Sequence, residues 1–273
     1  MGYRIFVLCL RQVLLNIKVA FQLSWMWIVL MIGLSLAAGI AFSGLTAGNS
    51  GGGIFANFLI FLVVFIILLL NVTSIAIGWH RYVLREESPP QFHVINTKWP
   101  LGSYIWKSIK IALLFMLIFI PIMLIASPFL PSVLLQVSNQ SSNLTSTLLT
   151  FMAISLPINI FALWVLLRIG LVLPASAVGN QISIKEAFRT TSGYAGQLAI
   201  TATLLALLYS IPGLFQILFL EIPNPQNISE FNQFQTGNLI FSIVTLAFNW
   251  FTFFVSVGIL TVLYGHLCEE RPI

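Results

Sequence analysis

Six long apolar runs constrain this chain more than any other feature of its sequence. A helix needs about 20 apolar residues to cross the roughly 30 Å hydrocarbon core of a bilayer. Only 7% of the 273 residues are charged, compared with about 25% in a typical soluble domain. The sequence therefore predicts an all-α polytopic membrane helical bundle that forms a single domain over residues 1–273. The six predicted transmembrane helices cover approximately residues 21–42, 55–78, 105–127, 148–173, 196–220 and 238–263.

The 12 Lys and Arg residues are all predicted to lie on one side of the membrane. They precede the first run, separate the second from the third, and follow the fourth and the sixth. The other connections, near residues 43–54, 128–147 and 221–237, contain neither Lys nor Arg. Loops rich in Lys and Arg stay in the cytoplasm. We therefore expect a multi-pass protein with its N- and C-termini cytoplasmic.

A unit of about ninety residues is predicted to be repeated three times. An Ile followed by Gly or Pro recurs in each odd-numbered run, at separations of 88 and 91 residues. A mixed polar and apolar segment precedes each of these runs, which favours a short amphipathic helix at the interface before each hairpin. The Gly and Pro positions are predicted helix breaks: Gly33, Pro121 and Pro212. The parallel hairpin repeats have approximate bounds 1–90, 91–180 and 181–273.

The clearest interfacial helix is predicted to begin after Ser183. Glu186 follows three residues later, which is the spacing of a capping box. Lys185 and Arg189 fall on a different face from Ala187.

The exit of the second run, "GWHRYVLREESPP", supports two interpretations. Trp79, His80, Arg81 and Arg85 are typical of an interfacial anchor, in which aromatic rings sit among headgroups and arginines face phosphates. The alternative is a functional site. We favour the anchor because charges at the edge of a span cost little to place.

Four polar residues inside the predicted spans are candidates for contact with a ligand or a lipid. Asn71, Asn159 and Asn249 each lie in an even-numbered run, and Arg168 lies near the end of the fourth. The three amides meet if the repeats pack around a threefold axis; otherwise each ties two helices together. Arg168 either snorkels to the interface as an anchor or binds an anionic group.

No nucleotide-binding, metalloprotease or nucleophile-elbow motif is present in the sequence. The spacing of His80, His93 and His266 is not that of a metal site on one helix. We therefore expect no catalytic residues, no metal and no cofactor. We interpret the positive net charge as the result of Lys and Arg residues that set the membrane orientation and contact lipid headgroups. Nucleic acid is not an expected partner.

Two stretches, "AIGWHRYVLREE" at Ala76–Glu87 and "SIKEAFRTTSG" at Ser183–Gly193, resemble a known family. It comprises six-span bacterial inner-membrane proteins of unknown function, related to the membrane domain attached to some glycerophosphodiester phosphodiesterases. The resemblance implies six helices in a bacterial inner (plasma) membrane. This chain lacks the soluble phosphodiesterase domain and its metal carboxylates, so the resemblance implies no hydrolase activity.

The sequence is compatible with three functions. The first is a membrane protein without catalytic activity that organises anionic lipids, or a membrane-protein partner, through its basic cytoplasmic face. The second is a small transporter or channel with a polar site near Arg168 and the intramembrane asparagines. A membrane enzyme, the third, would need a polar cleft with a paired acid and base.

Overall fold

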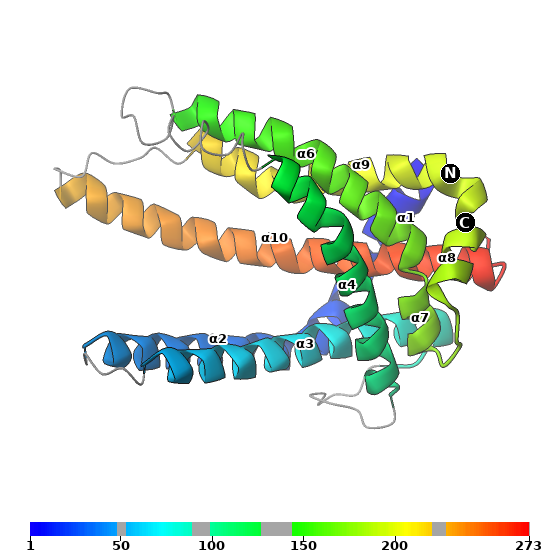
Figure 1. Ribbon diagram of the computed structural model, residues 1–273, viewed down its shortest axis with the longest axis horizontal. Coiled ribbons are helices and arrows are strands. Elements are labelled where there is room, and N and C mark those ends of the chain that lie inside the picture. Colours follow the sequence, from blue (N-terminus) through cyan, green and yellow to red (C-terminus); the bar gives the residue numbers. More distant parts are fainter. Residues whose placement is uncertain (48–52, 89–98, 127–143, 220–227, 273) are drawn as a thin grey trace.

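The protein is built from helices throughout the part of the chain that a computed structural model describes (Figure 1). The predicted all-α class is therefore confirmed. The predicted loops near residues 43–54, 128–147 and 221–237 lie partly outside the described residues. The described residues are 1–47, 53–88, 99–126, 144–219 and 228–272.

Long apolar helices make up most of the molecule. In a bilayer they satisfy their own backbone groups, because hydrocarbon offers no hydrogen-bonding partner. Along the chain, the elements are α1 (Gly2–Leu15), α2 (Ile17–Ala47), α3 (Gly53–Arg85), α4 (Leu101–Ala126), α6 (Leu144–Ile169), α7 (Val172–Ala177), α8 (Ile184–Thr190), the 3₁₀ turn η2 (Ser192–Tyr194), α9 (Ala195–Phe219) and α10 (Ile228–Cys268).

Within the described residues, five helices are long and apolar enough to cross a membrane. A sixth span is obtained if α1 and the first part of α2, Ile17–Leu30, count as one bent span. The chain is therefore a multi-pass membrane protein with five or six spans, by the length and composition of its helices. The five segments are Leu59–Arg85, Leu101–Pro121, Met152–Ile169, Ser192–Phe215 and Phe241–Cys268.

A bend of 70° separates α1 from α2. It is centred on Asn16, whose backbone N–H and side-chain Nδ2 both donate to the carbonyl oxygen of Gln12, at 3.1 and 2.8 Å. The Asn16 Oδ1 accepts a hydrogen bond of 2.7 Å from the hydroxyl of Tyr82 on α3. The bend is thereby fixed against a neighbouring helix, and it directs α1 across α9 and α10.

The predicted helix breaks are not breaks. Gly33 lies within the continuous α2, Pro121 within α4 and Pro212 within α9. A helix continues past a proline in a bilayer because neighbouring groups satisfy the carbonyl that the missing N–H leaves free. The interfacial helix predicted before the third run is also absent as a separate element, since residues 101–115 form the first half of α4.

The capping box predicted for α8 is confirmed. The Glu186 backbone N–H donates to Ser183 Oγ at 3.2 Å, and the Ser183 N–H donates to Glu186 Oε2 at 2.8 Å. The bond from the Ser183 backbone lowers the pKa of the Glu186 carboxyl. The cap is therefore intact at neutral pH and weakens only as the pH falls through that lowered pKa.

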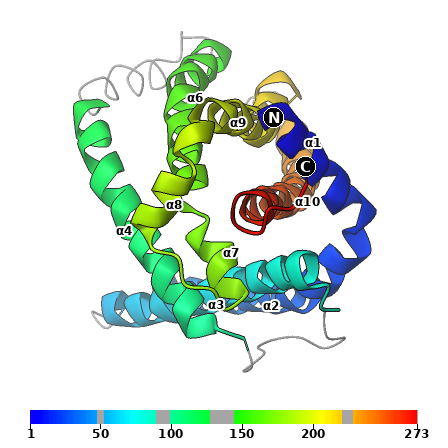
Figure 2. The ribbon, with the colours of Figure 1, turned by 90° about the vertical axis from the view of Figure 1, so that its right-hand side faces the viewer.

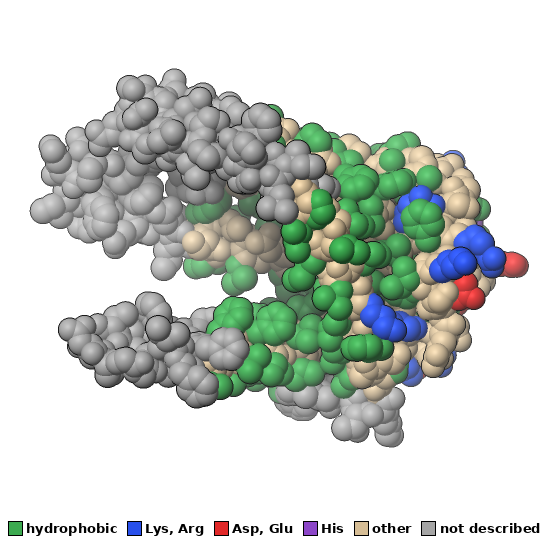
Figure 3. Space-filling model, in the orientation of Figure 1, with side chains coloured by type: hydrophobic (Ala, Val, Ile, Leu, Met, Phe, Trp, Pro, Cys, Tyr) green, Lys and Arg blue, Asp and Glu red, His purple; other side chains and the backbone are tan. Residues whose placement is uncertain are grey.

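Among the side chains that the structure describes, the buried ones gather at one end of the bundle. Along α3, the described residues up to Leu70 are exposed or half-buried, whereas those from Thr73 to His80 are buried. Along α10, the buried residues likewise begin near Thr252. This buried end carries both termini (Figure 1), and α10 lies there among α1, α3, α7 and α9 (Figure 2). Figure 3 shows that the Lys and Arg side chains of the visible face gather at the same end.

Three helices finish at this end with a left-handed residue. Glu86 follows α3 with φ 55°, Gly179 follows α7 with φ 87°, and Glu270 follows α10 with φ 54°. After α3 and α10, the next N–H bonds the carbonyl six residues back, Glu87 to Arg81 at 3.5 Å and Arg271 to Gly265 at 2.9 Å. These bonds stop α3 and α10 where apolar sequence gives way to charge. After α7, the Asn180 N–H bonds the carbonyl of Ala175 at 2.8 Å and the Gly179 N–H bonds that of Ser176 at 3.1 Å, which is the pattern of a Schellman C-cap.

The close approach of α10 to the end of α6 predicts that Gly170→Ala destabilises the protein. A Cβ at this position would lie 2.6 Å from the carbonyl oxygen of Leu166 and 2.8 Å from Leu260 Cδ2. Relieving such overpacking costs about 1–3 kcal/mol, so we expect a lower temperature of aggregation in detergent, measured by size-exclusion chromatography of heated samples.

Gly196→Ala is the control for this substitution. Gly196 lies in the first turn of α9, and nothing lies within 4 Å of its added Cβ. Replacing an unconstrained helical glycine stabilises by roughly 0.5–1 kcal/mol. Equal effects of the two substitutions would contradict the close packing at Gly170.

Candidate functional site

Trp79 and His80, predicted as interfacial anchors, are instead fully buried. The Trp79 ring packs edge-on against Phe254 of α10, with centroids 5.1 Å apart. His80 lies between two hydroxyls, with Nδ1 2.8 Å from Thr261 Oγ1 and Nε2 3.3 Å from the Tyr104 hydroxyl. Their placement differs from the prediction because α3 exits beside α4 and α10, which cover these side chains, rather than among headgroups.

Arg81 and Arg85 bind the end of a neighbouring helix. Nη1 of Arg81 donates to the carbonyl oxygen of Ala177 at 3.0 Å, and Nη2 of Arg85 donates to that of Val178. These are carbonyls that the C-terminus of α7 leaves without intrahelical partners. Arg81 also forms a two-pronged ion pair with Glu87, at 2.7 and 2.6 Å. The two arginines thus cap α7 and join it to α3.

Arg168 is buried in the last turn of α6. Its Cζ lies 3.6 Å from the ring centroid of Phe188 and 5.2 Å from that of Trp164. Nη2 donates to the carbonyl oxygen of Phe188 at 3.3 Å, while Nε has no partner among the described residues. Aromatic faces and the negative end of the α6 dipole thus compensate its charge. α8 covers this residue, so it does not reach the surface by snorkelling.

The three asparagines occupy different surroundings. Asn71 is buried, with its Oδ1 unpaired in the described part of the chain. Asn159 and Asn249 are exposed within their spans. No hydrogen bond between any two of these three amides is found among the described residues. The structure therefore does not bring Asn71, Asn159, Asn249 and Arg168 into one polar site.

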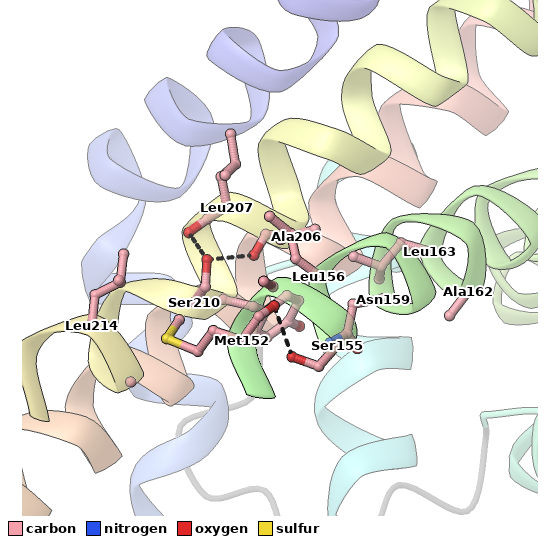
Figure 4. A pocket seen from close by; sticks show the side chains of 13 residues that line it. Met152, Ser155, Leu156, Asn159, Ala162, Leu163, Ala206, Leu207, Ser210 and Leu214 are labelled. Carbon is pink, nitrogen blue, oxygen red and sulfur yellow. Dashed lines mark hydrogen bonds between the residues drawn. The ribbon is translucent and has the colours of Figure 1, made fainter. Parts of the chain in front are cut away.

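A groove of about 610 Å³ opens between α6 and α9 (Figure 4). Asn159 lines it on the α6 side, and Tyr209 and Ser210 line it on the α9 side. Asn159 was predicted from the sequence as a candidate, whereas neither residue of α9 was. Tyr and Ser are unremarkable in an apolar helix, and no local pattern shows that they face another span.

The partners of His80 were also missed. Tyr104 and Thr261 are separated from it by 24 and 181 positions. A sequence signal for such a contact would have to come from paired changes between distant positions. Within the described residues, no group of three or more His, Cys, Asp or Glu side chains could hold a metal ion.

Comparison with protein-family models, with curated proteins and with solved structures found no match for this chain. The resemblance carried by Ala76–Glu87 and Ser183–Gly193 therefore stays a prediction.

The contact between Arg168 and Phe188 predicts that Phe188→Leu loosens α8. Removing the aromatic face takes away a cation–π contact worth about 0.5–2 kcal/mol, and it leaves the guanidinium less well compensated. We expect faster amide hydrogen exchange across Ile184–Thr190, measured by mass spectrometry on the detergent-solubilised protein.

Arg189→Gln is the control, since Arg189 is an exposed residue of the same helix. Its substitution should leave the exchange of α8 unchanged. Identical exchange in wild type and Phe188→Leu would show that the aromatic contact does not hold α8 in place.

Proposed function

We propose that this protein organises anionic lipids at the cytoplasmic face of a bacterial inner membrane and has no catalytic activity. The observation that carries the proposal is a set of exposed cations at the end of the bundle that bears both termini. Among the described residues, ion pairs involve Arg81 and Arg271. The exposed cations outside those pairs include Arg4, Arg11, Lys18, Lys110, Lys185 and Arg189.

α1 provides the best surface for this role. It buries Ile5, Cys9 and Val13 against α9 and α10, and it exposes Arg4 and Arg11 on another side. The exposed side also carries apolar side chains, among them Tyr3, Leu14 and Leu15. A helix that mixes exposed cations with apolar side chains lies in the interface and binds anionic headgroups.

Orientation and repeat organisation are part of this proposal. Anionic lipids of the cytoplasmic leaflet attract nearby Lys and Arg residues, which favours a cytoplasmic position for the basic end. The hexapeptides Leu84–Pro89 ("LREESP") and Leu267–Pro272 ("LCEERP") coincide with two of the left-handed helix ends, which supports three parallel hairpin repeats. The resemblance to the six-span bacterial family agrees with this organisation.

A second candidate, a small transporter or channel, is favoured by one observation. The groove between α6 and α9 holds Asn159 within the membrane-spanning region. Arg168 would not be its polar site, because Phe188 and Trp164 cover it. Passage of glycerol into proteoliposomes, followed by the rate of reswelling after osmotic shrinkage, would support this function if Asn159→Leu abolished it.

Anionic lipid binding predicts that phosphatidylglycerol stabilises the purified protein more than phosphatidylcholine does. In the triple variant Arg4→Gln, Arg11→Gln, Lys18→Gln, this difference should fall. Each Lys or Arg near an anionic surface contributes about 1 kcal/mol, so the triple variant should bind phosphatidylglycerol about a hundredfold more weakly. Titration of each lipid into the detergent-solubilised protein, followed by its thermal unfolding, measures this.

The control is a triple variant that conserves charge: Arg4→Lys, Arg11→Lys, Lys18→Arg. It should still be stabilised more by phosphatidylglycerol than by phosphatidylcholine. High salt should reduce the preference in the wild type, since exposed charges are screened. Equal stabilisation of the wild type by both lipids would contradict anionic lipid binding. In that case, reproducible co-purification of a membrane protein through the basic end would favour a protein partner instead.

A further inference from the structure

The groove between α6 and α9 is a second candidate binding site, far along α6 from the basic end. Both walls belong to membrane-spanning segments, Met152–Ile169 and Ser192–Phe215. At the depth of these spans, the medium outside the bundle is lipid rather than water. Its volume of about 610 Å³ falls within the roughly 300–1,000 Å³ of pockets that bind small molecules.

The lining of the groove is uncharged. Apolar residues predominate, and the polar ones among the described residues are Ser155, Asn159, Tyr209 and Ser210. A charged ligand would find no opposite charge there, and burying an unpaired charge is very costly. The groove therefore suits a ligand without formal charge.

Three of the polar groups already have partners. The hydroxyls of Ser155 and Ser210 donate to carbonyls of their own helices at 2.9–3.2 Å, and Figure 4 marks these bonds with dashed lines. The Tyr209 hydroxyl lies 2.7 Å from Ser256 Oγ on α10. Among the described residues, no hydrogen bond is found for the exposed amide of Asn159. Its donors and acceptor remain for a ligand.

The depth of Asn159 makes this amide unusual. It lies nine residues before Arg168, which corresponds to about 14 Å along a helix. Half of the hydrocarbon core is about 15 Å, so Asn159 lies near the middle of the bilayer if Arg168 marks the interface. Hydrocarbon cannot satisfy an amide, and an unsatisfied polar group there is costly.

We propose that this groove binds an uncharged amphiphile, with a hydrocarbon chain along α6 and α9 and a hydroxyl or ester group hydrogen-bonded to Asn159. A neutral glycerolipid such as a diacylglycerol has this chemistry. The ligand differs in charge and in position from the anionic headgroups assigned to the basic end. The two sites are independent, and either can exist without the other.

The test uses the full chain in lipid nanodiscs and a diacylglycerol that carries a photoreactive diazirine in one acyl chain. After illumination, labelled peptides of α6 and α9 are quantified by mass spectrometry. The wild type should be labelled on both helices, and excess unlabelled diacylglycerol should compete. Asn159→Leu should reduce this labelling about threefold to tenfold, the net contribution of one hydrogen bond.

Asn249→Leu is the matched control, because Asn249 is also an exposed amide within a span and is not among the residues that line the groove. Its labelling should equal that of the wild type. Gly213→Phe tests the cavity directly. A Cβ there meets only Met152 at 3.7 and 3.9 Å, so the backbone tolerates a side chain whose ring fills the groove and blocks labelling.

Two results would overturn the proposal. One is equal loss of labelling in Asn159→Leu and Asn249→Leu. The other is equal labelling by a diazirine alkane without a polar group, which would show that the groove takes up hydrocarbon alone. Preference for phosphatidylglycerol, measured on the same variants, should be unchanged in Asn159→Leu, so failure of this site and failure of the basic end are distinguishable.

Discussion

The packed end of this protein depends on one constraint. The carbonyl groups at its helix ends must find hydrogen-bond donors where water is scarce. Arginines supply several of these donors. Arg81 and Arg85 bond the last carbonyls of α7, and Arg271 bonds the carbonyl of Leu84 near the end of α3 at 2.5 Å. Arg168 bonds a carbonyl of α8. One residue type thus joins α3, α6, α7, α8 and the C-terminal tail.

This use of arginine divides the cations into two groups. The cations that bond carbonyls are structural, because their donors are used within the protein. Those that remain exposed, on α1 and α8 above all, are available to the surroundings. The division also explains why the core lies at this end: side chains such as Trp79 and Tyr264 fill the space between helices whose ends are already fixed. Farther along the spans, apolar side chains face outward, as expected where the solvent is hydrocarbon.

Features that depend on local sequence could be predicted, and features that depend on distant partners could not. The apolar helices and the capping box of Ser183 and Glu186 follow from composition and from a three-residue spacing. The burial of His80 depends on Thr261, which lies on another helix, and no spacing within α3 indicates it. Pro121 and Pro212 show a different limit, because a bilayer enforces helical continuity against a residue that ends helices in water. Asn159 was recognised as a candidate, but the groove that it lines could not be predicted without knowing where α9 lies.

The position of α1 has a consequence for biogenesis. Its inner side packs on α9 and α10, and Thr201 Oγ1 donates to the carbonyl oxygen of Gly2 at 3.1 Å. α1 therefore rests on segments that are synthesised after it. Translation of the roughly 200 intervening residues takes about 10–40 s. Throughout that interval, α1 has only lipid or an insertion factor to shield Ile5 and Val13, and its packing is completed only when α9 and α10 are in place.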